Sequence, residues 1–477
     1  MAPPGFLHAC RKHTFEREAA EYRTSRRPEL TGGSNMLSIE ASRRHKTPPW
    51  SGMERHGAAG HPGATTMRSR ERVVRSVNHQ VPDRVPIDLG GMKASSIAAI
   101  AYDKVKHVLG ITTPTKVIDP RFMIAALEDT VLQRLHVDVV PLDLSCVLPL
   151  ARPDSEWLPR RLFDGTHVLF PPETRIAEDA AGNWILLNAD GSPSTFQMPR
   201  GGYYFDDVSF NQGDRLDPHK FRPVSDIPDE HLALLSDYGR ALYDNTDYAL
   251  LGWGFGVCFL GLSLITDRCS NVTQGLTNEW MMMLMTEKET CHEMMGRSVD
   301  ATIRCLTLLH EAVGDRVFAW GIAADDSGTQ RGEFIRPELW AEMIKPHYQT
   351  LCSWIHAHTP WKTFLHCCGS IYHLIPHLIE AGVDILNPVQ TSAANMDPAR
   401  LKQQYGDRLT FWGGGCDTQH VLGNARPEEI RAHVKERLAI FSPGGGYVFN
   451  QIHNIQANVP PENILAMFDA AHEFGSY

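Results

Sequence analysis

The chain has 477 residues, of which 42% are hydrophobic and 21% charged, and its formal net charge is −10. This composition is typical of a soluble enzyme with a large core, and mild acidity without a basic stripe argues against a nucleic-acid partner. No run of eighteen apolar residues occurs and no signal-peptide core is visible, so we expect no membrane contact and a cytoplasmic location. Ten cysteines without framework spacing suit a reducing compartment.

Residues 1–66 are rich in Arg, His, Pro, Gly and Ser and show no sustained apolar stripe. Such a segment buries too little apolar area to offset its ordering entropy, so we expect a disordered N-terminal extension. Its basic patches leave contact with an acidic partner open as an alternative. A helix-like run begins at Met67, and we expect the folded domain to cover residues 67–477.

From residue 85 onward, short apolar runs with polar or Gly-rich ends alternate with longer segments of helical spacing. Runs that are apolar on both faces are typical of a parallel sheet covered by helices, and eight βα units close into a barrel. We therefore predict an α/β fold of the (β/α)8 TIM-barrel class. The eight predicted strands are 85–91, 137–144, 249–255, 317–325, 362–368, 383–390, 409–415 and 446–453.

Residues 151–245 do not follow this alternation. Turn sequences such as DGTHV, DAAGNW and NADGSP separate short extended pieces there. We interpret them as β-hairpins inserted after the second strand, forming a flap over the barrel mouth. Among the helices, the one predicted over 337–355 carries an apolar stripe and should be kinked by Pro346, and another is predicted over 461–474.

Polar groups cluster at the C-terminal ends of the predicted strands, where chemistry is done in parallel α/β folds. His366 and Cys368 on the fifth strand lie two residues apart, so their side chains point to the same face of an extended chain. A neutral imidazole and a thiolate at this spacing can bind a soft cation such as zinc. The alternative is a core histidine beside buried thiols.

A zinc site with three protein ligands and an open position would use His366, Cys368 and either His453 or Cys416. Such an ion lowers the pKa of a bound thiol and holds it as a thiolate. A capping or core histidine is the alternative for His453, and the glycines before Cys416 favour close backbone approach there instead. Cys367 should point into the helical layer and only pack.

Adjacent Asp325 and Asp326 at the end of the fourth strand are candidates for a base and its orienting partner. A cation grip and a helix cap are the alternatives for this pair. The remaining polar groups expected at the mouth are Asn387, Gln390, Asp417, Asn450 and Asn454.

The chain resembles the uroporphyrinogen decarboxylase superfamily over roughly residues 67–477. The segments that carry the resemblance are PDRVPIDLGG, DDSGTQ, HCCGS, GVDILNPVQ, FWGGGCDTQ and GGGYVFNQIHNIQANVPPENI. That superfamily contains uroporphyrinogen decarboxylases of tetrapyrrole (heme) biosynthesis and zinc-dependent methyltransferases that exchange methyl groups between a corrinoid protein and a thiol such as coenzyme M. Both groups of enzymes are β/α barrels, so the resemblance implies this fold. It leaves decarboxylation and methyl transfer as alternative reactions.

Two departures favour the methyltransferase branch. The decarboxylases carry an RQAGR loop after the first strand to hold substrate carboxylates, whereas this chain reads GGMKASS with Lys93 as its only cation there. They also place an aspartate after the second strand to bind the pyrrole nitrogens, and we align that place with Ser145. A highly carboxylated porphyrinogen without both anchors would be poorly held.

The resemblance implies a hybrid set of zinc ligands. His366 and Cys368 match the His-x-Cys of the methyltransferases, whose third ligand is a cysteine near the C-terminus. His453 stands in that place here and matches the histidine of the decarboxylase NLGHG motif, which reads NQIHN in this chain. The expected zinc set is therefore His366, Cys368 and His453.

We expect zinc-assisted methyl transfer between a corrinoid carried by a partner protein and a small-molecule thiol. Metal-free decarboxylation of a porphyrinogen or another carboxylated substrate is the second hypothesis, and a non-catalytic binding barrel is the third. A homodimer is left open. The expected catalytic residues are Asp325, Asp326 and His453, and the expected substrate-binding residues are Gln390, Asn387, Asp417 and Asn450.

Overall fold

The structure is a computed structural model that describes residues 67–208, 221–260 and 278–477. The extension expected to be disordered, residues 1–66, lies outside the described residues. The chain divides by its internal contacts into residues 1–47 and 48–477, and every described residue belongs to the second unit.

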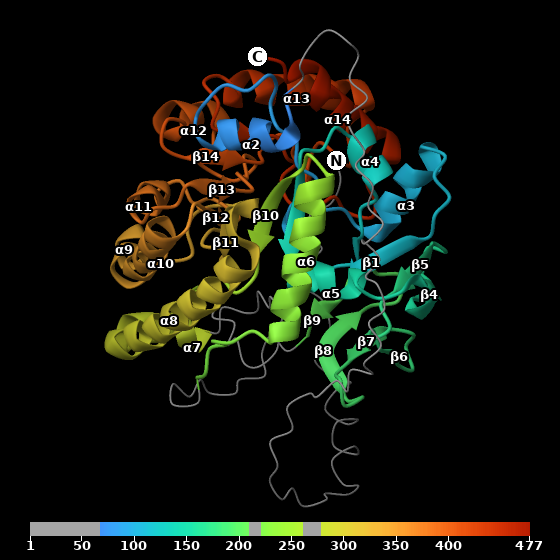
Figure 1. Cartoon of the computed structure of the whole chain (residues 1–477), viewed down its shortest axis with the longest axis horizontal. Helices are drawn as coiled ribbons and strands as arrows, with labels where there is room; N and C mark the ends of the chain where they lie inside the picture. Colours follow the sequence, from blue (N-terminus) through green and yellow to red (C-terminus); the bar gives the residue numbers. More distant parts are fainter. Residues whose placement is uncertain (1–66, 209–220, 261–277) are drawn as a thin grey trace, which may run out of the picture. The chain divides into compact units, whose positions relative to one another are not determined.

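Seven parallel strands form the central sheet, in the order β15-β14-β13-β12-β11-β10-β3 (Figure 1). Each coincides with a run predicted from the sequence, because strands apolar on both faces are buried between an inner core and a layer of helices. These strands are β3 Val139–Asp143, β10 Ala249–Trp253, β11 Val317–Ala324, β12 Lys362–His366, β13 Ile385–Asn387, β14 Thr410–Trp412 and β15 Tyr447–Val448.

Residues 85–91, predicted as the first strand, lie between the two outer strands of this sheet. The Asp138 N–H, next to β3, donates to the Ile87 carbonyl at 2.8 Å, and the Asp88 N–H donates to the Phe449 carbonyl at 2.9 Å. Ile87 and Phe449 form an isolated parallel bridge. The segment is not a regular strand, but it links both edges of the curled, barrel-like sheet.

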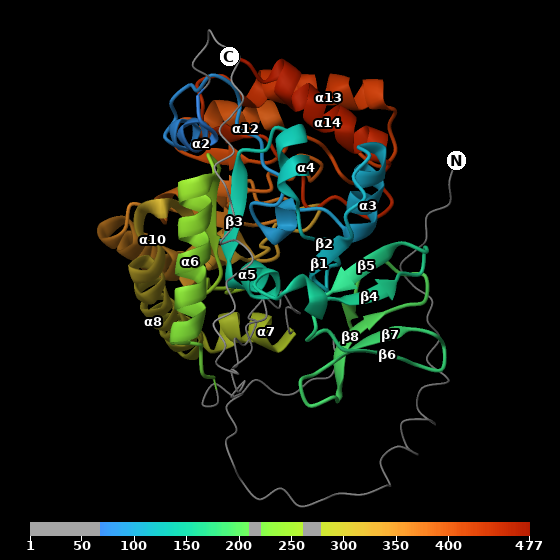
Figure 2. The same cartoon turned by 45° about the vertical axis from the view of Figure 1, so that its right-hand side comes forward.

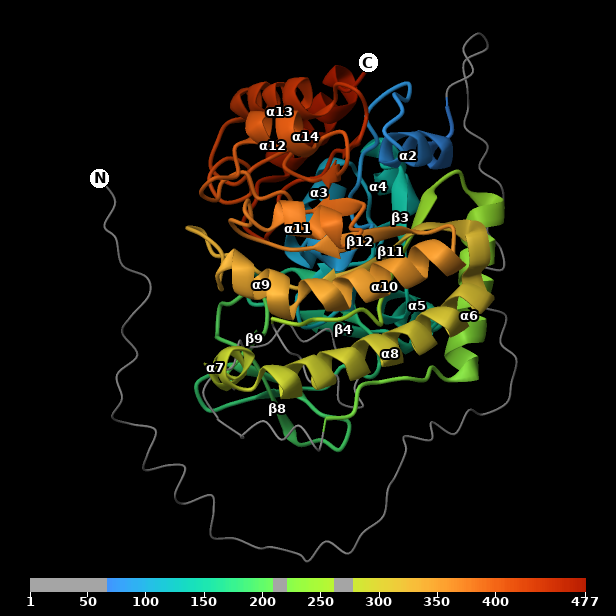
Figure 3. The same ribbon diagram turned by 90° about the vertical axis from the view of Figure 1, so that its left-hand side faces the viewer.

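The sheet encloses one hydrophobic core and is covered outside by helices. The side chains of the inner core are Val139, Ala249, Leu251, Trp253, Ala319, Phe364, Ile385, Trp412 and Val448, with Met92 and, from α2, Val73 and Val77. Figure 3 shows α8 and α10 side by side on the side of the sheet that faces the viewer, in front of β11 and β12. The α-helices are α2 Ser69–Val77, α3 Ala99–Val108, α4 Asp129–Arg134, α5 Leu144–Leu150, α6 Asp229–Asn245, α7 Asn278–Thr286, α8 Lys288–Val313, α9 Pro337–Met343, α10 Lys345–His358, α11 Ile375–Glu380, α12 Pro398–Tyr405, α13 Pro427–Phe441 and α14 Pro461–Phe474.

The helix predicted over 337–355 is present in two pieces. It is divided at Ile344, and Pro346 stands in the first turn of the second piece, α10. A proline inside a helix lacks the N–H for the ladder and clashes with the carbonyl four residues earlier, which accounts for the break. The helix predicted over 461–474 is confirmed as α14.

The insertion after β3 is β-rich, as predicted, and forms two small sheets. In the first, the hairpin of β4 Leu158–Arg161 and β5 His167–Phe170 pairs with β1 Thr115–Asp119, a strand that precedes β3 and was not predicted; β2 Ile124–Ala125 completes that sheet. The second contains β6 Ile176–Glu178, β7 Trp184–Leu187, β8 Pro193–Met198 and β9 Asp206–Asp207. Figure 2 shows β4 to β8 together next to β1 and α5.

The predicted boundary of the insertion at residue 245 is corrected by the structure. Residues 229–245 form helix α6, in which Leu235, Gly239 and Leu242 are buried at helical spacing. The β-rich part therefore ends before α6, and its role as a flap stays a prediction.

Glycines in β10 and β11 leave room for tryptophans of the neighbouring strand. A Cβ at Gly252 would lie 2.1 Å from Trp320 Cε3, and a Cβ at Gly321 would lie 1.9 Å from Trp253 Cε3. We expect Gly321→Ala to lower the free energy of unfolding by about 1–3 kcal/mol, because the methyl group overpacks a filled core. Urea unfolding measures this change.

Gly296→Ala is the matched control, because nothing lies within 4 Å of the Cβ that it adds to helix α8. We expect this variant to gain up to about 1 kcal/mol, since alanine is the better helix former. Equal stability of Gly321→Ala and the unmodified protein would contradict the packing argument.

Candidate metal centre

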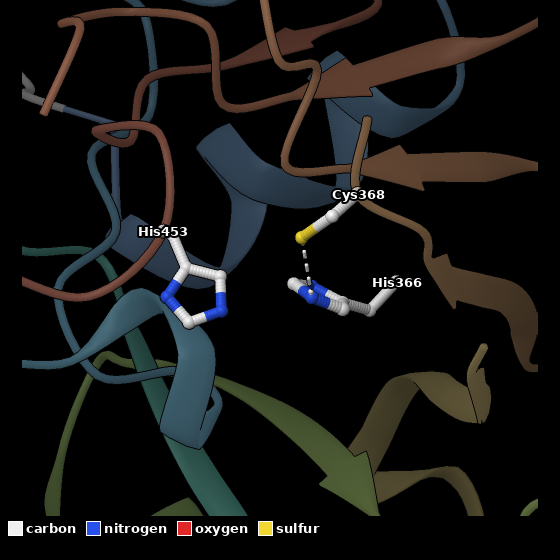
Figure 4. Close-up of side chains that lie close together, drawn as sticks. All are labelled: His366, Cys368 and His453. Atoms are coloured by element: carbon white, nitrogen blue, oxygen red, sulfur yellow. Dashed lines mark hydrogen bonds between the residues drawn. The ribbon is translucent and has the colours of Figure 1, made fainter. Parts of the chain in front are cut away.

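The end of β12 brings one imidazole and one thiol together. His366 is the last residue of the strand, and its Nε2 lies 3.3 Å from the Cys368 Sγ (Figure 4). His453 lies opposite them, after β15, with its ring centroid 5.5 Å from that of His366. One ligand atom from each of these three residues lies within 4.8 Å of the other two. The structure therefore brings together the three side chains that the sequence predicted would meet.

The three side chains fit a zinc ion. Zinc bonds of about 2.0 Å to nitrogen and about 2.3 Å to sulfur at tetrahedral angles place the ligand atoms roughly 3.3–3.8 Å apart. The 3.3 Å separation of His366 Nε2 and Cys368 Sγ already meets this spacing, and a ligand atom of His453 lies within 4.8 Å of both. Across the described ranges, this is the one trio of His, Cys, Asp or Glu that gathers so closely.

Two of these groups are held in their neutral forms by the protein. Burial raises the pKa of the Cys368 thiol well above its usual value, and the Asp326 carboxylate adds to the rise. His453 is exposed to solvent, yet desolvation first and the His366 imidazole second lower its pKa. A neutral imidazole is the form that binds metals, and a bound cation deprotonates a coordinating thiol.

Two backbone hydrogen bonds hold the segment that carries His453. The Ile452 N–H donates to the Cys416 carbonyl and the Ile455 N–H to the Ser96 carbonyl, both at 2.9 Å. Between these contacts, His453 adopts a left-handed backbone conformation with φ of 64°. Few residues other than glycine adopt this conformation, and histidine is among those that do so more often. The direction of the imidazole is thus set by the backbone on either side of it.

Asp326 lies beside the trio. Its Oδ1 accepts a hydrogen bond from the Cys368 N–H at 2.8 Å and lies 4.0 Å from His366 Nε2. Its side chain is 46% exposed, so the carboxylate is open to solvent at the edge of the site. Asp326 therefore holds the backbone of Cys368 in place and keeps a carboxylate close to the imidazole of His366.

Asp325, predicted as a catalytic residue, is held by hydrogen bonds within the protein, and its catalytic role stays a prediction. Its carboxylate accepts hydrogen bonds from the backbone N–H groups of Phe259 and Leu260, at 3.0 and 2.9 Å, and from the Tyr348 hydroxyl at 2.8 Å. Asp325 is 1% exposed. Successive residues point to opposite faces of an extended chain, so Asp325 anchors the loop after β10 and helix α10 while Asp326 faces the trio.

The four residues predicted to bind substrate hydrogen bond within the protein. Asn387 and Asn450 are fully buried. Asn387 contacts His366 and Asn450 donates to the Asp88 carbonyl, and direct contact with substrate stays a prediction for these two residues. Gln390 accepts a hydrogen bond from the Gly369 N–H, and Asp417 caps the turn that follows it. For Gln390 and Asp417, contact with substrate stays a prediction.

Two cysteines near the site do not join it. Cys416, the alternative third ligand, is fully buried in the hydrophobic core and is not in the trio, so it is corrected to a packing residue. The Cys367 thiol is buried and accepts a hydrogen bond from the Ser327 N–H at 3.3 Å. Cys367 therefore packs in the helical layer, as predicted.

Sequence reasoning missed Asp143, the last residue of β3. We aligned the decarboxylase aspartate with Ser145, but an aspartate, Asp143, lies two residues earlier. The Asp143 Oδ1 accepts a hydrogen bond from the Ser145 N–H at 2.8 Å. Desolvation raises the pKa of Asp143, and the Lys93 ammonium opposes the rise. Lys93 itself is paired with Asp119 at 2.6 Å. Its position in the sequence could have revealed it, because Asp143 is a polar residue at the C-terminal end of an apolar run, where functional residues of such barrels lie.

Comparisons with known proteins show similarity over part of this chain. The family model described as "Uroporphyrinogen decarboxylase (URO-D)" matches residues 262–474, which include the whole trio. This part of the chain is therefore similar to the uroporphyrinogen decarboxylase family. The chain is 35% identical to a uroporphyrinogen decarboxylase of Methylococcus capsulatus over 97 residues, which are 20% of the chain and 26% of that relative.

A uroporphyrinogen decarboxylase of Anaeromyxobacter dehalogenans is 25% identical over 209 residues, which are 43% of this chain and 53% of the relative. The alignments thus span between about a quarter and a half of these two curated relatives. Among solved structures, a methyltransferase from Methanosarcina mazei matches with a TM-score of 0.51 and 15% identity, covering 86% of this chain and 99% of that one. That likeness supports the barrel-like fold. No helix among the described residues is long and apolar enough to span a bilayer.

Proposed function

We propose that this protein is a zinc-dependent methyltransferase that moves a methyl group between a corrinoid, carried by a partner protein, and a small-molecule thiol. The observation that carries the proposal is the set of His366, Cys368 and His453, with ligand atoms within 4.8 Å of one another. Three protein ligands with a fourth position open are typical of catalytic zinc. We also propose that residues 85–91 count as the first strand of a (β/α)8 barrel.

The side chains around the trio suit this chemistry. A bound zinc ion would lower the pKa of a thiol substrate and hold it as a thiolate, the nucleophile for a methyl group. His366 and Cys368 would bind the ion from β12, and His453 would complete the set from the segment after β15. Asp326, half-exposed beside them, is placed to accept the proton that the thiol releases.

Metal analysis of the purified full-length protein tests the proposal. We expect about one zinc per chain at neutral pH, because a ligand set with a single thiolate and two imidazoles favours this ion. Methylation of a thiol such as coenzyme M by a methylated corrinoid protein should stop on chelation with 1,10-phenanthroline and return when zinc is restored. Absence of stoichiometric zinc would remove the proposal.

Decarboxylation of a carboxylated tetrapyrrole is the second candidate, and Asp143 is the observation that favours it. An aspartate at the end of the second barrel strand is the group that the decarboxylases use on pyrrole nitrogens. Lys93, however, is already paired with Asp119, which leaves it poorly suited to hold substrate carboxylates. Turnover of uroporphyrinogen that persists during chelation would favour this candidate over methyl transfer.

A further inference from the structure

We propose that Asn387 is a positioning residue that fixes which ring nitrogen of His366 faces the metal centre. The proposal rests on the proposed metal site, and it adds a residue outside the trio. Asn387 ends β13 and is the register partner of His366 on β12. Its Oδ1 lies 2.6 Å from His366 Nδ1, on the side of the ring away from Cys368.

The orientation of the Asn387 amide follows from its second contact. Its Nδ2 lies 2.9 Å from the backbone carbonyl of Trp412, at the end of β14. A carbonyl oxygen only accepts hydrogen bonds, so the NH2 group must face Trp412 and the amide oxygen must face His366. The hydrogen-bond partners alone therefore fix which end of the Asn387 amide is the oxygen and which is the nitrogen.

The orientation of the amide decides the tautomer of His366. The Asn387 oxygen is an acceptor, so His366 Nδ1 must carry the hydrogen of the neutral imidazole. The lone pair then lies on Nε2, the nitrogen that is 3.3 Å from the Cys368 Sγ. His366 is thus prepared as a ligand through Nε2, with its ring held by three adjacent strands.

Burial makes this contact hard to replace. Asn387 and Trp412 are both 0% exposed and His366 is 4% exposed, so water has little access to their shared hydrogen bonds. Losing the amide would leave a buried N–H and a buried carbonyl without partners. The ring would then be free to adopt the other tautomer, with hydrogen on Nε2.

A similar contact backs the third ligand. Asn454 Oδ1 hydrogen bonds with His453 Nδ1, and Gln456 Nε2 donates to the same oxygen at 3.1 Å. Both imidazoles are therefore supported by an uncharged asparagine oxygen. A neutral acceptor orients the ring without adding negative charge, so a divalent ion bound to one thiolate and two imidazoles would keep a net positive charge for thiol activation.

The test compares Asn387→Leu with Asn463→Leu. Leucine at 387 keeps a similar volume and removes the acceptor. Asn463 is the matched control because it is 3% exposed and its amide donates to two carbonyls, of Leu422 and Ala425, remote from the trio. Two properties are measured: the tautomer of His366 in metal-free protein, by nitrogen and carbon NMR, and zinc affinity, by competition with a chelator.

We expect His366 to carry its hydrogen on Nδ1 in the unmodified protein and to populate the Nε2–H form in Asn387→Leu. Zinc affinity should fall by about 10- to 100-fold in that variant. Asn463→Leu should keep both properties, even where it loses comparable stability. A purely structural role for Asn387 predicts an unchanged tautomer.

The outcomes separate this proposal from the proposed function. Failure of the unmodified protein to bind zinc would remove the metal site, while the NMR spectrum still decides the tautomer. Hydrogen on Nε2 in the unmodified protein would overturn the role of Asn387, and this measurement needs no variant to fold. Retention of both the tautomer and the zinc affinity in Asn387→Leu would overturn it as well.

Discussion

Cys368→Ala is expected to abolish stoichiometric zinc and, with it, methylation of the thiol. Cys368 supplies the only anionic ligand of the trio, and two neutral imidazoles would remain. Structural zinc sites bind with about 10–16 kcal/mol over four ligands, so the loss of one ligand should weaken binding by at least about 100-fold. Metal content after dialysis and the rate of methyl transfer measure the effect.

Cys367→Ala is the control for this experiment, because Cys367 is adjacent in sequence and packs in the helical layer instead of joining the trio. We expect it to keep zinc and activity, with only a modest loss of stability. Circular dichroism confirms that both variants are folded. Zinc and turnover retained in Cys368→Ala would show that the trio does not form the working site.

Asp138→Ala is expected to lower the free energy of unfolding by about 3–5 kcal/mol, because it removes the carboxylate that pairs with Arg84 and leaves Arg72 with Asp83 alone. Asp138 is 0% exposed, and its carboxylate lies 2.7 Å from guanidinium nitrogens of both Arg72 and Arg84. It also accepts the Ser69 hydroxyl and the Ile87 N–H. One carboxylate thus joins α2, β3 and the segment that links the two edges of the sheet.

Asp469→Ala provides the comparison, since it breaks a half-exposed ion pair with Arg134. That pair should contribute at most about 1 kcal/mol, because solvent screens it. Urea unfolding of both variants, followed by circular dichroism, measures the difference. The argument fails if the Asp138 variant proves no less stable than the Asp469 variant.

The pattern of apolar runs was sufficient to predict most of the fold. Strands buried on both faces leave a plain signal, and seven of the eight predicted runs are strands of one parallel sheet. The run over 85–91 forms one isolated bridge, at Ile87, and the apolar pattern of a sequence does not distinguish such a bridge from a regular strand. Strands β1 and β2 were missed because they are short, with 5 and 2 residues, and so few positions carry little pattern.

The candidate site was predictable where spacing alone fixes geometry. His366 and Cys368 share a face because they lie two residues apart, whatever the rest of the chain does. The contacts of Asp325 and Asn387 could not be predicted because both faces of a central strand are buried, so apolar alternation does not reveal which face a terminal residue takes. The contact of Asn387 with Trp412 forms because β13 pairs with β14, and the order of strands in a sheet cannot be read from the apolar pattern.

The trio also connects distant parts of the chain. His366 and Cys368 lie at the C-terminal end of β12. His453 lies in the segment after β15, which two backbone hydrogen bonds hold in place. An ion that bridges them binds only where both parts are in place, so occupancy and folding are thermodynamically linked; a free concentration of 100 times the dissociation constant would stabilise the native state by about 2.7 kcal/mol. Withdrawal of the ion should therefore favour local opening of the C-terminal segment, with faster amide exchange there than in the sheet.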